Sequence, residues 1–219
     1  MTTAPADLFA DAPHLPGIEE LGPGAQLLRG FALGAAADLL SALGPITALA
    51  PFRHMLTPGG FRMSVAMTNC GQYGWVSDRR GYRYDPRDRE SGLPWPEMPA
   101  ALQDLAGQAA AVAGFVNFVP DVCLINRYQP GTKLSLHQDK DERDFGQPIV
   151  SVSLGLPAIF LWGGAARAER PRRLALTHGD VLVWGGPARL HYHGVAPLKP
   201  GDHPQLGACR INLTFRRAN

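Results

Sequence analysis

The chain is poor in cysteine. Its 219 residues include only Cys70, Cys123 and Cys209, and no two of them form a C-x-x-C pair. An odd number of scattered cysteines is atypical of a disulfide framework or a cysteine-based zinc site, and it fits a reducing compartment. Residues 1–10 also lack the basic and apolar segments of a secretory signal. From these absences we expect a cytoplasmic protein.

Long apolar runs are equally scarce. The strongest candidate, residues 145–166, has no charged side chain, but it contains two prolines, four glycines and the alternating pattern Val150-Ser-Val-Ser-Leu154. This pattern predicts a buried strand, a turn and a second strand rather than a membrane-spanning helix. The formal net charge is only +2, which neither requires nor excludes a polyanionic partner. The length and the 45% hydrophobic content predict one compact domain with a full core.

Composition divides that domain into three segments. They are a lead-in with a helix, a cover of short strands and glycine turns, and a helix followed by the main strands: residues 1–49, 50–96 and 97–219. The first 25 residues are rich in Pro, Gly and Ala, and we expect them to pack loosely. Helices are predicted over residues 32–43, ended by Gly44-Pro45, and over residues 99–113, closed by Gly114.

Strand signals dominate after residue 120. Short apolar or alternating runs recur between Gly and Pro turns, at residues 121–128, 149–156, 158–162, 173–176, 180–184, 189–195 and 208–216. Many short strands with such turns are typical of an all-β barrel or jelly roll. We therefore predict a mainly β fold with flanking helices, a double-stranded β-helix (jelly roll) whose mouth is covered by residues 50–96.

The most informative motif is His137-Gln-Asp139, followed later by His193 in His191-Tyr-His-Gly. Residues i and i+2 of a strand point to the same face, so His137 and Asp139 can offer donor atoms to one ion, and His193 would complete a three-ligand set. Two histidines and a carboxylate with open positions are typical of non-haem Fe(II) oxygenases. His191 and His193 are also i and i+2, so a four-ligand zinc or manganese site in a cupin-like protein stays open.

A second candidate site lies on the last predicted strand. Alternation places Arg210, Asn212 and Arg216 on one face and apolar residues on the other. Burial of two arginines is costly unless they meet an anion, and a dicarboxylate suits that face. An edge strand with its polar face in water is the alternative. Asn126 and Tyr128 share a face of an earlier strand and can donate hydrogen bonds to the same guest.

These residues resemble those of the AlkB-like Fe(II)/2-oxoglutarate-dependent dioxygenases. The resemblance runs from about Pro51 to Arg216 and leaves the lead-in poorly matched. Its specific stretches are Thr57-Pro-Gly-Gly, Met63-Ser-Val-Ala-Met-Thr-Asn-Cys-Gly, Leu124-Ile-Asn-Arg-Tyr, Leu134-Ser-Leu-His-Gln-Asp-Lys-Asp-Glu, Pro148-Ile-Val-Ser-Val-Ser-Leu-Gly and Asn212-Leu-Thr-Phe-Arg. So many matching segments in one order exceed a chance motif match.

The resemblance implies roles for three groups of residues. Fe(II) is expected to be held by His137, Asp139 and His193. The 2-oxoglutarate cosubstrate is expected among Asn126, Tyr128, Arg210, Asn212 and Arg216, with Arg210 pairing its distal carboxylate. The substrate nucleotide is expected to contact Met67, Trp75, Tyr82, Tyr84, Asp141 and Arg167. In this arrangement the damaged base lies between Trp75 and the His137 ring, and Asp141 lies beside its exocyclic amine.

The resemblance also implies the reaction. It indicates an oxidative demethylase that repairs N-alkylated bases such as 1-methyladenine and 3-methylcytosine by Fe(II)/2-oxoglutarate/O2-dependent hydroxylation, releasing formaldehyde, succinate and CO2. The expected substrate is alkylated single-stranded DNA, with double-stranded DNA or RNA as alternatives, and residues 50–96 become a nucleotide-recognition lid. We expect a monomer. Two other classes stay open: a non-catalytic lesion-binding module and the cupin-like zinc or manganese protein.

Overall fold

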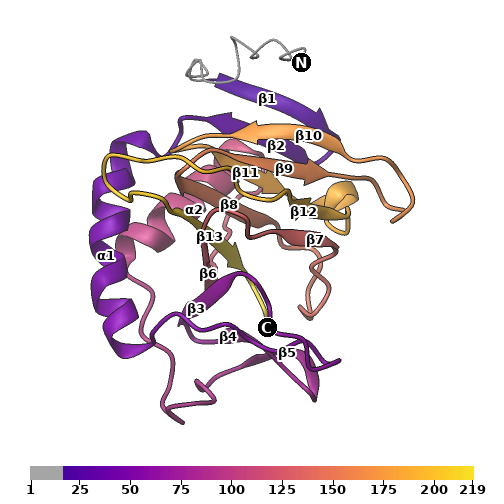
Figure 1. Ribbon diagram of the computed structural model, residues 1–219. Helices are drawn as coiled ribbons and strands as arrows, with labels where there is room; N and C mark the ends of the chain where they lie inside the picture. Colours follow the sequence, from indigo (N-terminus) through magenta and orange to yellow (C-terminus); the bar gives the residue numbers. More distant parts are fainter. Residues whose placement is uncertain (1–16) are drawn as a thin grey trace, which may run out of the picture.

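The computed structural model describes residues 17–219, which form two stacked β-sheets, two helices and a separate hairpin (Figure 1). In chain order the elements are β1 (Gly17–Gly22), β2 (Ala25–Arg29), α1 (Ala36–Leu49), β3 (Ala66–Gly71), β4 (Gly74–Asp78), β5 (Gly81–Asp85), α2 (Ala100–Val112), β6 (Val122–Tyr128), β7 (Leu134–His137), β8 (Ile149–Gly155), β9 (Ala158–Trp162), β10 (Arg172–Leu176), β11 (Val181–Trp184), β12 (His193–Val195) and β13 (Arg210–Arg216). Short 3-10 turns occur at Leu33–Ala35 and Gly186–Ala188.

The strands form a large sheet, a small sheet and a hairpin. The large sheet has the order β1-β2-β11-β8-β13-β6-β3, the small sheet has the order β10-β9-β12-β7, and β4 pairs with β5. All the paired strands of residues 17–219 run antiparallel. The predicted jelly-roll class with flanking helices is confirmed. None of the helices in these residues is long and apolar enough to cross a membrane.

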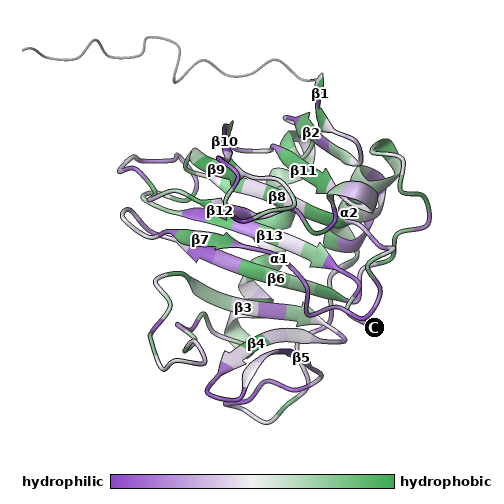
Figure 2. Cartoon of the chain, turned by 90° about the vertical axis from the view of Figure 1, so that its right-hand side faces the viewer, coloured by the Kyte–Doolittle hydropathy of each residue, from purple (hydrophilic) through white to green (hydrophobic). Residues whose placement is uncertain are grey.

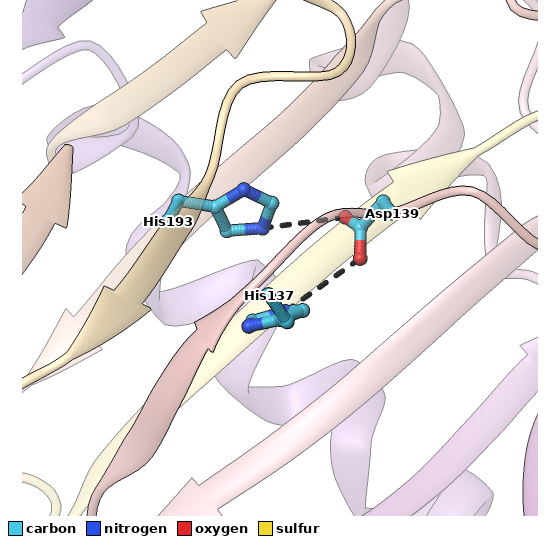
Figure 3. Close-up of side chains that lie close together, drawn as sticks. All are labelled: His137, Asp139 and His193. Carbon is cyan, nitrogen blue, oxygen red and sulfur yellow. Dashed lines mark ion pairs between the residues drawn. The ribbon is translucent and has the colours of Figure 1, made fainter. Parts of the chain in front are cut away.

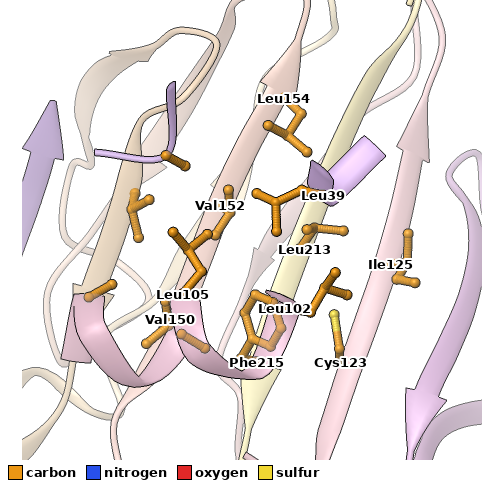
Figure 4. Close-up of a cluster of buried hydrophobic side chains, with 14 of the residues drawn as sticks. Leu39, Leu102, Leu105, Cys123, Ile125, Val150, Val152, Leu154, Leu213 and Phe215 are labelled. Carbon is orange, nitrogen blue, oxygen red and sulfur yellow. The ribbon is translucent and has the colours of Figure 1, made fainter. Parts of the chain in front are cut away.

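Both helices cover the outer face of the large sheet. Leu39 of α1 and Leu102 and Leu105 of α2 pack against apolar side chains of β6, β8 and β13, including Val152 and Phe215 (Figure 4). Side chains alternate along a strand, so the opposite face of β13 carries polar residues such as Arg210 and Asn212. The inward residues of β2 and β11, such as Leu27 and Trp184, are apolar and form a second core between the two sheets.

The predicted helix end at Gly44-Pro45 is wrong, because α1 continues to Leu49. A proline inside a helix removes one backbone donor and frees the carbonyl four residues earlier. Here Ser41, Gly44 and Pro45 are all exposed, so water can satisfy that carbonyl. The buried face continues through Ile46, and burial keeps the helix intact.

The loosely packed lead-in is wrong for residues 17–25. They form β1, the turn after it and the first residue of β2. β1 is the edge strand of the large sheet, and β2 joins it to β11. Inward positions such as Ala25 and Leu27 are buried. Small residues and glycine turns concealed this hairpin in the sequence. The remainder of the expected lead-in, residues 1–16, lies outside the described residues.

The predicted cover, residues 50–96, divides between two parts of the fold. β3 is not part of a cover, because it is the edge strand of the large sheet and pairs with β6. The β4–β5 hairpin stands apart and is pale or purple in Figure 2, whereas β9 and β11 carry green apolar segments. Gly74 allows its attachment, since a Cβ there would lie 2.3 Å from the Trp95 ring. That the hairpin recognises nucleotides stays a prediction.

The turn that precedes β11 gives a pH prediction. The backbone N–H of Gly155 donates to His178 Nδ1 at 3.0 Å, and burial together with nearby His203 lowers the pKa of His178. The unfolded chain therefore binds a proton first as pH falls below about 6.5, and stability is lost from there towards the lower folded pKa. We expect His178→Asn, whose amide oxygen can accept the same hydrogen bond, to lose less stability than wild type between pH 7.5 and 5 in urea unfolding. An equal loss would contradict this.

Candidate active site

A cavity of about 630 Å³ lies between the inner faces of the two sheets and the β4–β5 hairpin. This volume is typical of small-molecule sites. Most of the predicted site residues line it: Met67, Trp75, Tyr82, Asn126, Tyr128, His137, Asp139, Asp141, Arg167, His193, Asn212 and Arg216. The structure therefore brings together residues that are up to 149 positions apart in the chain.

The three predicted metal ligands converge at this cavity (Figure 3). His137 ends β7, His193 begins β12, and these two residues lie opposite each other in the small sheet. Asp139 Oδ1 is 3.7 Å from His137 Nε2, and Asp139 Oδ2 is 3.6 Å from His193 Nε2. All three donor atoms lie within 4.8 Å of one another. The expectation that Asp139 lies on the strand is wrong, since β7 ends at His137.

Backbone carbonyls orient both imidazoles. His137 Nδ1 lies 2.8 Å from Ser135 O, and His193 Nδ1 lies 3.0 Å from His191 O. A carbonyl can only accept, so each Nδ1 carries the proton and each Nε2 presents its lone pair towards Asp139. Phe160 also stacks on the His193 ring with centroids 5.8 Å apart. The two histidines are held as metal ligands require.

The protonation states also fit a divalent metal. Desolvation, together with His193, lowers the pKa of His137 to about 4, so this ring is neutral at pH 7. Burial alone would raise the pKa of Asp139, but the Arg216 guanidinium outweighs it and holds that pKa well below its usual range. Metal ligation needs neutral imidazole and ionised carboxylate. Two imidazole nitrogens, one carboxylate and an adjoining cavity therefore suit Fe(II) with open positions.

His191 does not join this group. It precedes β12, which begins at His193, so it does not lie on the predicted strand 189–195, and its ring packs against Trp162 with centroids 5.2 Å apart. Within residues 17–219, the cluster of possible metal ligands contains three side chains, without His191. This arrangement disfavours the four-ligand cupin-like alternative.

Arg210 supplies the second half of the site. Its side chain is 1% exposed, its guanidinium carbon lies 5.0 Å from the centre of the Tyr128 ring, and Nη2 donates to Ser153 Oγ at 3.0 Å. Nε and Nη1 are buried without a hydrogen-bond partner, as is Asn126 Oδ1. Unpaired buried groups of this kind are costly unless a ligand meets them. A carboxylate of 2-oxoglutarate can accept hydrogen bonds from these unpaired guanidinium nitrogens.

Two other predicted cosubstrate residues, Asn212 and Arg216, have side chains that are hydrogen-bonded within the protein. Asn212 Nδ2 donates to Ser151 Oγ at 2.8 Å and to Val152 O at 3.0 Å, so this amide is held within the sheet. Arg216 lines the cavity, but its Nη2 and Nε donate to Asp139 Oδ2 at 2.7 and 3.1 Å. The structure therefore places Arg216 on Asp139, a candidate metal ligand, which the sequence could not indicate.

Of the predicted substrate residues on the hairpin, two line the cavity and one does not. Trp75 and Tyr82 stack with ring centroids 5.5 Å apart and line the cavity, and Trp75 Nε1 donates to Asp141 Oδ2 at 2.8 Å. Tyr84 is not among the cavity-lining residues. Its hydroxyl instead donates to the buried Glu142 at 2.6 Å. A stacked pair and a carboxylate thus face the cavity, whereas Tyr84 lies behind its wall.

The remaining predicted substrate residues, Met67 and Arg167, also line the cavity. Met67 is a buried residue of β3, and Arg167 lies near the Tyr192 ring, 5.8 Å from its centroid. Three further basic residues that the sequence did not single out also line the cavity: Arg62, Lys133 and Lys140. A cavity with cationic side chains suits an anionic polymer such as nucleic acid.

Comparison with known proteins agrees with this geometry. The model of the 2OG-Fe(II) oxygenase superfamily matches residues 24–216. Alpha-ketoglutarate-dependent dioxygenase AlkB of Escherichia coli (strain K12) is 57% identical over 212 residues, which cover 97% of each chain. The solved structure of OsALKBH1 superposes with a TM-score of 0.81 at 30% identity and covers 92% of this chain and all of its own.

Two more distant relatives match shorter parts of the chain. The DNA N(6)-methyladenine demethylase ALKBH1D of Arabidopsis thaliana is 41% identical over 44% of this chain and 24% of its own length. The tRNA demethylase abh1 of Schizosaccharomyces pombe is 30% identical over 59% of this chain and 43% of its own length.

Proposed function

The chain belongs to the 2OG-Fe(II) oxygenase superfamily, and on that premise we propose that it is an oxidative demethylase of N-alkylated bases in nucleic acid. Its reaction depends on Fe(II), 2-oxoglutarate and O2. The observation that carries the proposal is a cavity lined by a His-His-Asp donor set and by an aromatic pair that a base can stack on, with the buried Arg210 guanidinium, two of whose nitrogens are unpaired, beside the cavity-lining Tyr128. Relatives that demethylate DNA and tRNA support the substrate class.

The site residues divide the work. When bound, the metal with 2-oxoglutarate and O2 supplies the oxidation that hydroxylates an N-methyl group, with release of CO2 and succinate. His137, Asp139 and His193 would hold the metal through Nε2 and carboxylate oxygens, and Arg210 would fix the far carboxylate of the cosubstrate. The hydroxymethyl product loses formaldehyde and leaves the base with its original N–H or ring nitrogen.

The substrate side explains why a methylated base would be selected. N1-methylation of adenine or N3-methylation of cytosine makes the base cationic. Trp75 offers an electron-rich ring and Asp141 a carboxylate at the same cavity, and both favour a cation. A base in a duplex cannot reach a cavity of this kind without leaving the stack. We therefore expect alkylated single-stranded DNA to be the main substrate, with RNA and duplex DNA as slower ones. We also propose that the enzyme is monomeric and cytoplasmic.

The direct test is product formation. The protein, loaded with Fe(II) under anaerobic conditions, is mixed with 2-oxoglutarate and oligonucleotides that carry 1-methyladenine or 3-methylcytosine, and then exposed to O2. We expect restored bases, formaldehyde and succinate in equal amounts, measured by mass spectrometry. Tight binding of the methylated strand without succinate would instead favour the lesion-binding module. Matched DNA and RNA strands in the same assay rank the substrates.

Replacing Trp75 tests the stacking platform. Base–aromatic stacking contributes about 1–3 kcal/mol, so Trp75→Ala should raise the KM for a methylated oligonucleotide by roughly 5- to 150-fold. The KM for 2-oxoglutarate should stay unchanged, because Trp75 lies on the hairpin and Arg210 on β13. Trp75→Phe keeps a ring but loses the N–H that Asp141 accepts, and it should show a smaller effect. Equal KM values in all three proteins would exclude Trp75 as the platform.

A further inference from the structure

The four-residue segment Asp139–Glu142 connects the metal ligands with the hairpin. Asp139 belongs to the ligand group, Asp141 accepts the indole N–H of Trp75, and Glu142 accepts the hydroxyl of Tyr84 at 2.6 Å. Asp139 and Asp141 have roles in the proposed function. Glu142 lines no part of the cavity, yet its side chain is only 1% exposed. A buried carboxylate that touches no substrate needs another explanation.

Glu142 belongs to a buried group of four charges. Its Oε2 lies 3.0 Å from Arg189 Nη2, and its Oε1 lies 3.4 Å from Arg216 Nε. The side chains of Arg189 and Arg216 are 3% and 6% exposed, and Asp139 is the second carboxylate of the group. Two positive and two negative charges therefore balance where water is largely excluded. Removing one member of such a group leaves a buried charge without compensation.

Both arginines that contact Glu142 also hold Asp139. Arg216 donates twice to Asp139 Oδ2, the oxygen that faces His193. Arg189 Nη1 donates to the backbone carbonyl of Asp139 at 2.8 Å, and Arg189 Nε donates to Gln147 O at 3.0 Å. One arginine thus fixes the carboxylate and the other fixes the backbone of the same ligand. Glu142 is the acidic side chain that touches both.

We propose that Glu142 is a positioning residue for Asp139, which keeps that carboxylate oriented and available to a divalent metal by sharing the charges of Arg189 and Arg216. Without Glu142, Asp139 is the one carboxylate left to two guanidinium groups, and the local charge becomes positive. A metal ion must then compete with a stronger Asp139–Arg216 pair for the charge of the carboxylate and enter a less favourable potential. The proposal rests on the proposed function only for the identity of the metal.

The test is metal affinity, measured by titrating Co(II) into the metal-free protein. We expect Glu142→Gln to bind Co(II) about tenfold more weakly, the low end of the cost of removing a direct partner of a metal ligand, because Glu142 acts on Asp139 through the two arginines. Glu97→Gln is the matched control, because Glu97 is exposed and distant in sequence from the cavity residues, and its affinity should equal that of wild type. The unfolding temperature of each metal-free variant shows whether that variant is folded at the temperature of the titration. A lower unfolding temperature with wild-type Co(II) affinity would overturn the proposal.

A second variant tests the proposal if Glu142→Gln does not fold. Glu142→Asp keeps the buried charge but shortens the side chain by one methylene, so it cannot contact Tyr84 and both arginines as Glu142 does. If the glutamine variant is unfolded, weaker Co(II) binding by the aspartate variant supports the proposal, and wild-type binding overturns it. Co(II) binding does not require turnover. An absence of demethylation by the wild-type protein would therefore count against the proposed function alone.

Discussion

Replacing His137 by alanine should abolish both metal binding and demethylation. Its Nε2 is one of three donor atoms that lie within 4.8 Å of one another, and its Nδ1 is fixed on Ser135 O. Removing even a partner of a metal ligand typically costs 10- to 100-fold in metal affinity, so loss of a ligand should cost more than roughly 100-fold. The measurements are Co(II) titration of the metal-free protein and formaldehyde release from a 1-methyladenine oligonucleotide.

His191→Ala is the matched control for that experiment. His191 lies two residues from His193, but its ring packs on Trp162 and it is not in the ligand cluster. We expect His191→Ala to keep the metal and to keep turnover. Loss of metal in this variant would restore the four-ligand zinc or manganese site. Full turnover by His137→Ala would contradict the three-ligand assignment itself.

The strands were predictable where alternation was strict. In β13, apolar Ile211, Leu213 and Phe215 face the helices, and polar residues between them face the interior, so the period of two marks both faces at once. The same pattern cannot reveal register. That His137 lies opposite His193 depends on how β7 pairs with β12, which is a tertiary property. The sequence could place two ligands on strands but not across from each other.

Local signals failed where tertiary burial decided the outcome. Pro45 indicates a helix end, yet its exposed position lets α1 continue. β3 has the same glycine-rich neighbours as the hairpin, and only its pairing with β6 separates the two. Residues 17–29 form two short strands around Gly22-Pro-Gly24 without a strict polar–apolar alternation, so their local pattern does not mark them as strands. In each case packing against residues distant in the sequence outweighed the local helix or strand propensity.

In the candidate site, too, residue type could be predicted from the sequence, whereas burial could not. Residue types with metal or anion chemistry could be picked out singly, and the structure gathers most of them around one cavity. Glu142 and Arg189 could not be found, because a charged residue in a loop is usually exposed and their burial depends on each other. Tyr84 was expected at the substrate, and its partner Glu142 explains why it lies behind the wall.

Replacing Arg210 by methionine should weaken 2-oxoglutarate binding and stabilise the metal-free protein at the same time. Loss of one partner of a buried charge pair costs about 2–5 kcal/mol, so the Kd for 2-oxoglutarate should rise roughly 30- to several-thousand-fold. Without the ligand, Nε and Nη1 of Arg210 are buried and unpaired, and such groups cost about 1–3 kcal/mol. Methionine removes that cost and can still pack against Tyr128. Calorimetric titration into Mn(II)-loaded protein and thermal unfolding measure the two effects.

The opposite signs distinguish a binding role from a structural one. If Arg210 mainly held β13 to its neighbours through Ser153, the methionine variant would lose stability as well as affinity. Arg173→Met, at an exposed position of β10, is the control and should change neither quantity. Unchanged 2-oxoglutarate affinity in Arg210→Met would exclude this guanidinium as the anion partner. Arg210 would then destabilise the ligand-free protein and yet be required for ligand binding. This combination is expected where selection acts on binding rather than on stability.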